Sequence, residues 1–373
     1  MKEFAPYYYT IYWFVVMLMT VTKFSEMRSM HGYSIIYKRQ SYNYIIFFSV
    51  FYILFLGLRP ITIEFWDTVN YSTTYQALQT LGTMDVDLPA EFDSDWLFYH
   101  FMALCAQIID VHSFFVIVMY FYVAMMFTGC RKVDPWHGAI LMLFCIGAYS
   151  FYSYSVNGIR NGVACSFVIL AIGGVCRGER IWPIVLSFIA IGCHKSVALP
   201  LACMFFTYFV RNPKLMYSVW FGSIVISLVF GEAVTSLMSM LSFDQRIEEM
   251  GKTSDQVYEE WDVEFVARFR WDFLLYSSAP ILLGFYTLFI RKIYNSTYLM
   301  LLGTYIYANS FWIIVIRDFY SSRFAYLSWF LYPIVLAYPL FNLPVFEKNH
   351  SQKTALILLA HFGFTTIMWL LGK

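Results

Sequence analysis

Residues 181–210 read IWPIVLSFIAIGCHKSVALPLACMFFTYFV, an apolar stretch that Arg180 precedes and Arg211 follows. His194 and Lys195 interrupt the stretch near its middle. Basic residues mark the cytoplasmic ends of membrane segments, so both ends of this stretch are predicted to lie in the cytoplasm. The stretch is therefore predicted to be a hairpin of two short or broken helices, with His194 and Lys195 at its outward tip. Membrane proteins use this geometry to place polar groups at a binding site.

The whole chain has the composition of a helical membrane protein. Of its 373 residues, 60% are hydrophobic and only 13% are charged, with a mean hydropathy of +0.60. Lipid offers backbone polar groups no partner, so apolar segments of this kind must be helices. We predict an all-α polytopic protein with one integral membrane domain, residues 1–373. A net charge of +1 says little about partners, but the sequence has no basic patch of the kind that nucleic acid needs, so no nucleic acid partner is expected.

About twelve transmembrane helices are expected. The first is interpreted as a retained span rather than a signal peptide, because no small-residue cleavage site follows it. The predicted spans are residues 7–22, 43–58, 112–129, 136–152, 159–176, 181–194, 196–210, 215–231, 272–290, 298–316, 324–341 and 353–371.

Residues 96–109 are apolar but are assigned to the membrane surface. With this assignment every short loop rich in Lys and Arg falls on one side, which is predicted to be the cytoplasm. Two larger, acidic loops, residues 59–111 and 232–271, then face the periplasm. Both interleave aromatic with charged residues, and each is predicted to contain a helix in the membrane plane.

The seven cysteines are scattered through apolar segments without a CxxC pair, which predicts reduced packing residues and no disulfide framework. No metal site or cofactor is expected. The alternative is a divalent cation at Asp85 and Asp87, because Asp85-Val-Asp87 and Asp93-Ser-Asp95 both have the DxD pattern that metal-dependent glycosyltransferases use. A solvated acidic loop explains the same residues.

The predicted topology brings unusual polar residues to the outer side of the membrane. Polar side chains near hydrocarbon are costly, so several on one side indicate a polar cavity. Asn157, Arg160 and Asn161 have the spacing of one helical face. Arginines suit phosphate oxygens, and on the outer face of a membrane the expected phosphate is the diphosphate of a lipid carrier. The candidate set is Arg59, Asp67, Tyr71, Asn157, Arg160, Asn161, His194, Lys195, Arg268, Arg270, Arg317, Asp318 and Arg323.

Several of these residues lie in motifs with a family resemblance. NGIRNGVACSFVILAIGG (157–174) and IWPIVLSFIAIGCHKSVALPLACMFF (181–206) resemble paired motifs of the EpsG-like, Wzy-type polysaccharide polymerases. LRPITIEFWDTVNY (58–71) is similar to the first outer loop of that family, and SSRFAYLSWFLYPI (321–334) to its late segment. Asn161 departs from the pattern, in which Gln is usual.

The resemblance implies a GT-C-like enzyme of the bacterial inner membrane that makes O-antigen, capsule or exopolysaccharide. It would join undecaprenyl-diphosphate-linked oligosaccharide repeat units at the periplasmic face, alongside a flippase and a chain-length regulator of the same pathway. Arg160 would stabilise the leaving diphosphate, together with Arg59, Arg323 and Lys195. His194 would be the base for the attacking hydroxyl, with Asp67 and Asp318 as rival bases.

Two other functions compete with this hypothesis. A transporter or flippase for lipid-linked glycans would also need a cationic cavity, but its charges would be spread through the depth of several spans. A membrane O-acyltransferase acting on the glycan would need a donor site reached from the cytoplasm, and no polar cluster is predicted there.

Overall fold

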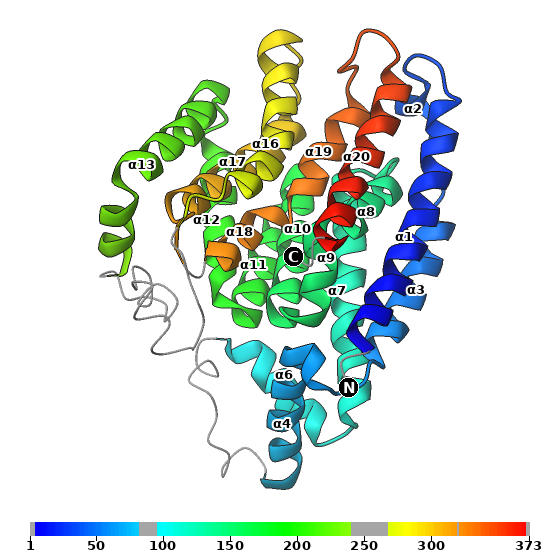
Figure 1. Ribbon diagram of the computed structural model, residues 1–373, viewed down its shortest axis with the longest axis vertical. Coiled ribbons are helices and arrows are strands. Elements are labelled where there is room, and N and C mark those ends of the chain that lie inside the picture. The colour runs from blue at the N-terminus through cyan, green and yellow to red at the C-terminus, as the bar shows by residue number, and fades with distance from the viewer. Residues whose placement is uncertain (1–3, 82–94, 240–267, 319–320, 371–373) are drawn as a thin grey trace. The chain divides into compact units, whose positions relative to one another are not determined.

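The computed structural model describes residues 4–81, 95–239, 268–318 and 321–370, and over these ranges its only regular elements are helices (Figure 1). These residues belong to two compact units. The first comprises Met1–Ala198 with Ala337–Lys373, and the second comprises Leu199–Leu336. Helices satisfy their backbone polar groups internally, as a lipid environment requires.

The first unit contains most of the N-terminal helices together with the last helix of the chain. Its elements are α1 (Phe4–Arg28), α2 (Ser34–Tyr37), α3 (Asn43–Gly57), the 3₁₀ turn η1 (Ile63–Phe65), α4 (Trp66–Leu81), α6 (Trp96–Ala106), α7 (Val111–Val133), α8 (Gly138–Ile146), α9 (Tyr149–Val156), α10 (Ile159–Cys176), α11 (Ile181–Cys193), the 3₁₀ turn η2 (Lys195–Val197) and α20 (His350–Leu370).

The second unit is built around α13 and α17, which pack side by side. Its elements are α12 (Ala198–Phe209), α13 (Pro213–Ser239), α16 (Trp271–Phe285), the π-turn η3 (Tyr286–Ile290), α17 (Ser296–Ile314) and α18 (Ser321–Trp329). Helix α19 (Tyr332–Asn342) carries the chain from the second unit back to the first. Helix α13 is kinked at Phe230, where the backbone leaves the helical region.

Each of the predicted apolar stretches contains a helix, but not all of these helices are long and apolar enough to cross a bilayer alone. Among the described residues, six helical segments are long and apolar enough to cross a membrane. A seventh is added if the bent pair α8–α9 forms one span. Helix α1 is 25 residues long yet outside this set, because its tyrosines and charged last turn reduce its apolar character. Helix α6 has 11 residues, about 16 Å of helix, too short for a hydrocarbon core of about 30 Å.

Small residues bring α7 and α10 together at the centre of the first unit. A Cβ atom on Gly129 would lie 2.7 Å from a side-chain carbon of Ile169, and one on Gly173 would lie 2.9 Å from Lys132. Interfaces between membrane helices are enriched in such residues because they let two backbones approach closely. This contact fixes α10, whose first turn carries Arg160.

The stretch predicted as one span at 136–152 is a broken helix. Helices α8 and α9 meet at an angle of 72°. The break exposes three carbonyl groups, and side chains from α1 and α20 donate hydrogen bonds to them: Tyr12 to Ile146, His361 Nε2 to Phe144 at 2.8 Å, and Thr365 to Gly147 at 2.8 Å. The break is stable because distant helices satisfy its backbone.

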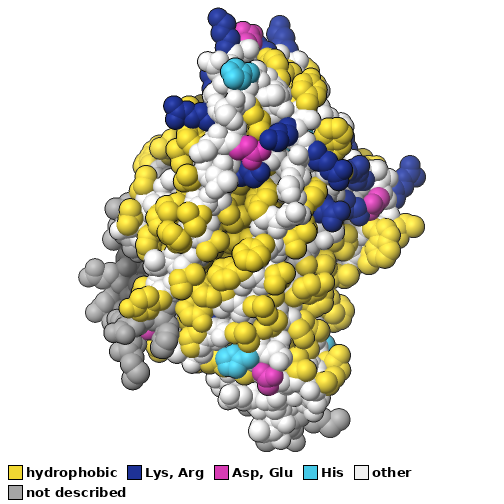
Figure 2. Space-filling view, turned by 90° about the vertical axis from the view of Figure 1, so that its right-hand side faces the viewer, with side chains coloured by type: hydrophobic (Ala, Val, Ile, Leu, Met, Phe, Trp, Pro, Cys, Tyr) yellow, Lys and Arg dark blue, Asp and Glu magenta, His cyan; other side chains and the backbone are white. Residues whose placement is uncertain are grey.

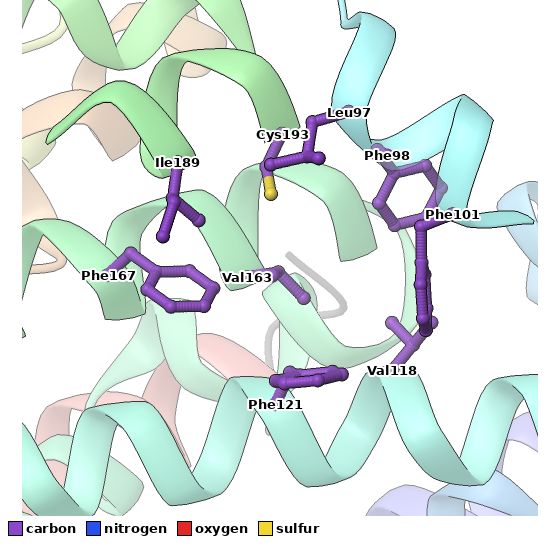
Figure 3. Close-up of a pocket in the computed structure, with 9 residues that line it drawn as sticks. All are labelled: Leu97, Phe98, Phe101, Val118, Phe121, Val163, Phe167, Ile189 and Cys193. Carbon is purple, nitrogen blue, oxygen red and sulfur yellow. The ribbon is translucent and has the colours of Figure 1, made fainter. Parts of the chain in front are cut away.

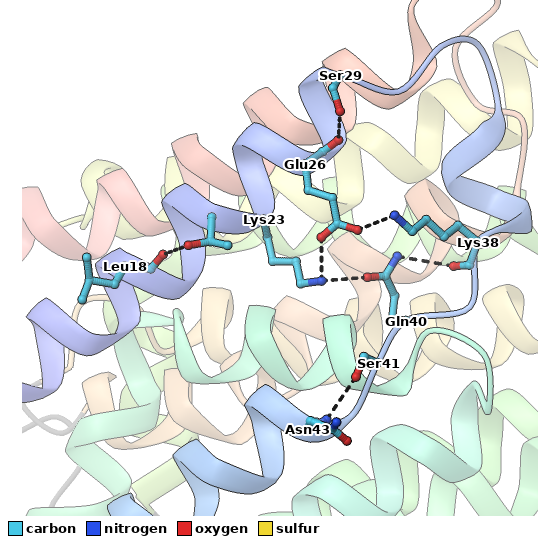
Figure 4. Close-up of polar contacts among 9 residues, drawn as sticks. Leu18, Lys23, Glu26, Ser29, Lys38, Gln40, Ser41 and Asn43 are labelled. Atoms are coloured by element: carbon cyan, nitrogen blue, oxygen red, sulfur yellow. Dashed lines mark hydrogen bonds and ion pairs between the residues drawn. The ribbon is translucent and has the colours of Figure 1, made fainter.

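Basic residues gather at one end of the face that α1 and α3 form in the first unit, above a broad hydrophobic band (Figure 2). Part of this end is a polar network between α1 and the segment before α3 (Figure 4). Lys23 and Lys38 each bind Glu26, at 2.8 and 2.7 Å, and Lys23 also donates to Gln40 at 3.2 Å. Lys23 lies near the end of α1 and Lys38 directly follows α2, at the end of the unit that the charge distribution predicts to be cytoplasmic.

Candidate functional site

The first unit contains a buried polar cluster that Asp95 holds together. The Asp95 carboxylate accepts hydrogen bonds from Arg160 Nη1 at 2.8 Å, His194 Nδ1 at 2.8 Å and the Lys195 backbone N–H at 2.9 Å. Only 2% of Asp95 and 4% of His194 is exposed. Hereafter the Asp95 cluster means Asp95, Arg160, His194 and Lys195, which reach one point from α6, α10 and the end of α11.

The close packing of α6 on α11 places Asp95 beside His194. A Cβ on Gly192 would lie 2.8 Å from Leu97 Cβ and 3.3 Å from the Trp96 ring. Only glycine permits this approach. One residue further on, Cys193 ends α11, and His194 takes an extended conformation that turns its side chain toward Asp95.

Arg160 lies in the first turn of α10 and is positioned by aromatic rings as well as by Asp95. Its guanidinium carbon is 5.6 Å from the ring centroid of Tyr71, on α4, and 5.2 Å from that of Tyr99, on α6. Both tyrosines are buried. Cation–π contacts of this kind strengthen where water is excluded, so Tyr71 and Tyr99 help to orient the guanidinium.

Asp95 remains a carboxylate in this environment. Burial raises its pKa, but the hydrogen bond and charge of His194, the charge of Arg160 and the bond from the Lys195 N–H together lower it below the ordinary value of 3.8. A buried carboxylate with several donors is stabilised in its charged form. Asp95 is therefore ionised at neutral pH.

An ionised Asp95 determines the tautomer of His194. The carboxylate can only accept, so the Nδ1 atom of His194 carries the proton of this hydrogen bond and Nε2 is the basic nitrogen of the neutral ring. A carboxylate at Nδ1 both orients an imidazole and stabilises the imidazolium that forms when Nε2 takes up a proton. A pair of this kind is chemically able to act as a general base with an orienting carboxylate.

Arg59 and Asp67 lie in a second polar region of the same unit. Arg59 is fully buried, donates from Nε to the Thr68 hydroxyl at 2.8 Å and from Nη1 to the Leu56 carbonyl at 2.6 Å. Its guanidinium carbon is 5.0 Å from the Phe115 ring centroid. Burial lowers the pKa of Arg59 to about 10, and Asp67 is among the groups that oppose this shift, so the side chain stays charged.

Asn157 and Asn161 are not on one helical face. Helix α9 ends at Val156, Asn157 is its C-cap, and α10 begins only at Ile159. Gly158 separates the two helices, so the spacing of these residues does not describe a continuous turn. Asn161 follows Arg160 on α10, and its carboxamide oxygen accepts from the Cys165 thiol at 3.3 Å.

The remaining candidates belong to the second unit. Arg270 forms a bidentate pair with Asp272, with Nη2–Oδ2 and Nε–Oδ1 distances of 2.8 and 3.0 Å, and stacks on Phe273. Arg317 packs against Gly231 of α13, and Asp318 is buried. Arg268 and Arg323 are exposed. The structure thus gathers Arg160, His194 and Lys195 in the first unit and gives the second unit a separate set of cations.

Asp85, Asp87 and Asp93 lie outside the described residues. Within the described part of the chain, no group of three His, Cys, Asp or Glu side chains could hold a metal ion. The seven cysteines are free thiols in the structure, and five of them are buried. The acidic residues around Trp261 that suggested a second in-plane helix also lie outside the described residues.

Asp95 is the member of the cluster that the sequence did not identify as a candidate site residue. It appeared only as the second Asp of a possible metal motif. It directly precedes α6, where an Asp usually caps the helix, yet its side chain makes no cap bond and binds Arg160 and His194 instead. An Asp at such a position is an ordinary cap signal, and only the packing of α6 on α11 gives it another role.

Comparison with known proteins shows a family and no individual relative. Residues 42–372 match the model of the EpsG family. No curated protein and no solved structure matches the chain.

Proposed function

The chain belongs to the EpsG family of Wzy-like polysaccharide polymerases, and from this premise we propose that it elongates a glycan by joining undecaprenyl-diphosphate-linked repeat units. The observation that carries the proposal is the Asp95 cluster, a buried Asp–His pair in direct contact with an arginine. The family implies glycosyltransferase chemistry in general, and the cluster provides the groups that such chemistry needs.

In the proposed reaction a hydroxyl of the incoming repeat unit attacks the anomeric carbon of the growing chain. A new C–O bond forms there, and the bond from that carbon to the diphosphate oxygen breaks with its electron pair on the oxygen. The hydroxyl proton passes to His194 Nε2. Asp95 stabilises the resulting imidazolium, which later releases its proton to water.

The charge of the cluster favours departure of the diphosphate. Arg160 and Lys195 each carry one positive charge and Asp95 one negative charge, so with a neutral His194 the cluster has a net charge of +1. Positive charge in a partly buried site stabilises an anion more than the same charge in water does. We assign Arg160 and Lys195 to the leaving diphosphate.

We further propose that the cluster faces the periplasm. The loops rich in Lys and Arg mark the cytoplasmic side, and the cluster forms at the opposite ends of the spans, where the chain continues into the acidic loop before α6. Arg268, Arg270, Arg317 and Arg323 of the second unit are proposed to contact the glycan or a second diphosphate, with Asp318 beside them. Arg59 and Asp67 are proposed to support α4 and through it Tyr71.

The test compares two histidines in matched environments. His137 Nδ1 binds Asp134 Oδ2 at 2.8 Å and is as buried as His194, but no arginine contacts that pair among the described residues. The two variants, His194→Gln and His137→Gln, are made in the full chain. Each is purified, shown to be monodisperse and reconstituted into vesicles. Undecaprenyl-diphosphate-linked repeat units are supplied on the side of the acidic loops, and glycan length is read by gel electrophoresis.

His194→Gln should reduce elongation by about 10²- to 10⁴-fold, the usual contribution of a general base. His137→Gln should retain elongation per folded molecule. If correctly inserted His194→Gln elongates glycan at the wild-type rate, the assignment of His194 as the general base is refuted. Translocation of the lipid-linked unit by a wild-type protein that does not elongate it would instead favour the flippase hypothesis.

A further inference from the structure

An apolar cavity of about 340 Å³ lies in the first unit, between α6, α7, α10 and α11 (Figure 3). Its walls include Phe98 and Phe101 of α6, Phe121 of α7, Phe167 of α10, and Ile189 and Cys193 of α11. The lining side chains contain no nitrogen or oxygen atom, and the Cys193 thiol is the most polar group among them.

The cavity is partly open at the surface of the unit, and its volume is many times the roughly 30 Å³ that one water molecule occupies in the liquid. Water is not a suitable occupant, because it needs two to four polar partners and the lining side chains offer none. The cavity is at the lower end of the size range of ligand pockets, about 300–1,000 Å³. Its occupant is therefore an apolar group of limited size.

The cavity adjoins the Asp95 cluster on three of its walls. Leu97 of the lining is two residues after Asp95, Cys193 directly precedes His194, and Val163 is one helical turn after Arg160. A molecule with its chain in the cavity would therefore carry its head to the cluster. The site fits an amphiphile with an anionic head and an apolar tail.

We propose that this cavity holds the isoprenoid units nearest the diphosphate of the lipid-linked substrate, while Arg160 and Lys195 attract the diphosphate itself. The inference rests on the proposed function for the choice of an isoprenoid over another lipid chain. Only the first units fit in the cavity, so the remainder of the chain extends beyond it. By binding the start of the isoprenoid tail, the cavity would position the bond between the anomeric carbon and the diphosphate beside the Asp95 cluster.

The experiment uses binding without glycosyl transfer. The probe is an undecaprenyl diphosphate without sugar that carries a diazirine on the isoprenoid unit next to the diphosphate. The full chain in vesicles of phosphatidylethanolamine and phosphatidylglycerol is irradiated with the probe, and labelled peptides are mapped. We expect labels on α6, α7, α10 and α11, and their loss on addition of unlabelled undecaprenyl diphosphate.

Adjacent residues of α11 provide a matched pair of variants. Ile189→Trp should fill the cavity and lower labelling by about tenfold. Phe188→Trp should leave labelling unchanged, because Phe188 is 71% exposed and is not part of the lining. If Ile189→Trp does not fold, farnesyl diphosphate should still compete with the probe in the wild type whereas inorganic diphosphate should not.

Three results would overturn the inference: labels that map to other helices, equal competition by added phosphatidylglycerol, or full labelling of a folded Ile189→Trp. Because no sugar is transferred, these outcomes are independent of elongation. A protein that elongates glycan but is labelled elsewhere would retain the proposed function and lose this site. A protein labelled at the cavity that never elongates a verified cognate substrate would lose the function instead.

Discussion

Gly192→Ala tests whether the approach of α6 to α11 controls the chemistry of His194. The new Cβ would lie 2.8 Å from Leu97 Cβ, whereas carbon atoms pack best at about 3.5–4.0 Å. The start of α6 must then move away by roughly 1 Å. A shift of that size would lengthen the 2.8 Å bond between Asp95 and His194 Nδ1 beyond hydrogen-bonding distance.

The expected effect on elongation is large, while the variant should remain folded. A misplacement of about 1 Å in a catalytic arrangement costs about 10²-fold in rate. Overpacking destabilises a protein by about 1–3 kcal/mol, but replacing Gly by Ala within a helix returns up to about 1 kcal/mol. The variant should therefore fold and insert while elongating glycan about a hundredfold more slowly.

Gly363→Ala in α20 is the matched control, because a Cβ at that position meets nothing within 4 Å. Both variants are assayed in vesicles for glycan length and by thermal unfolding in detergent. Gly363→Ala should elongate normally. Elongation by a folded Gly192→Ala at the wild-type rate would refute the view that Asp95 must contact His194.

Three further predictions concern Arg160, Arg59 and the groups that bind them. In the folded protein the pKa of Asp95 lies below its ordinary 3.8, so its carboxylate stabilises the fold at all pH values above that value and the benefit is lost as pH falls through the lowered pKa. The difference in Tm between wild type and Asp95→Asn, a buried-pair disruption worth about 3–5 kcal/mol, should hence not narrow between pH 8 and 5 and should shrink only below about pH 4; narrowing between pH 7 and 5 would implicate another group. Arg160→Lys keeps the charge but not the planar fork between Tyr71 and Tyr99, and should fold while slowing elongation by about 10- to 100-fold; an unchanged rate would show that charge alone suffices. Thr68→Val leaves Arg59 Nε without its acceptor and should cost about 1–3 kcal/mol in chemical denaturation without changing elongation per folded molecule. Its control is Thr73→Val, whose exposed hydroxyl bonds only within α4; equal losses of stability in the two variants would contradict a supporting role for Arg59.

The helices were predictable where one apolar run coincides with one helix. Residues 159–176 were predicted as a span, and α10 has these bounds because Gly158 and the apolar run that follows define them locally. The bend between α8 and α9 was not predictable. Its sequence contains no Pro and no charged residue to mark a break. The side chains that satisfy its carbonyls come from α1 and α20, and the His361 donor lies 217 residues beyond its acceptor.

The basic residues of the candidate site were predictable from the sequence, but Asp95, the carboxylate that binds them, was not. Arg160, His194 and Lys195 were conspicuous as polar residues in or beside long apolar runs. Asp95 stood among other acidic residues, and its role depends on a helix contact that a single glycine permits 95 residues after Leu97. Likewise, Asn157 was assigned to the face of Arg160 by spacing alone, although a helix boundary falls between them.

The dependence of the α8–α9 bend on the last helix affects how the protein is made. During synthesis this bend enters the bilayer long before the ribosome reaches His361 and Thr365, which satisfy two of its carbonyls. Until then those carbonyls face hydrocarbon without a partner, at several kcal/mol each. A chain in which α20 has not yet packed therefore carries unsatisfied backbone carbonyls at this bend. Packing of the first unit is therefore complete only once α20 has joined it.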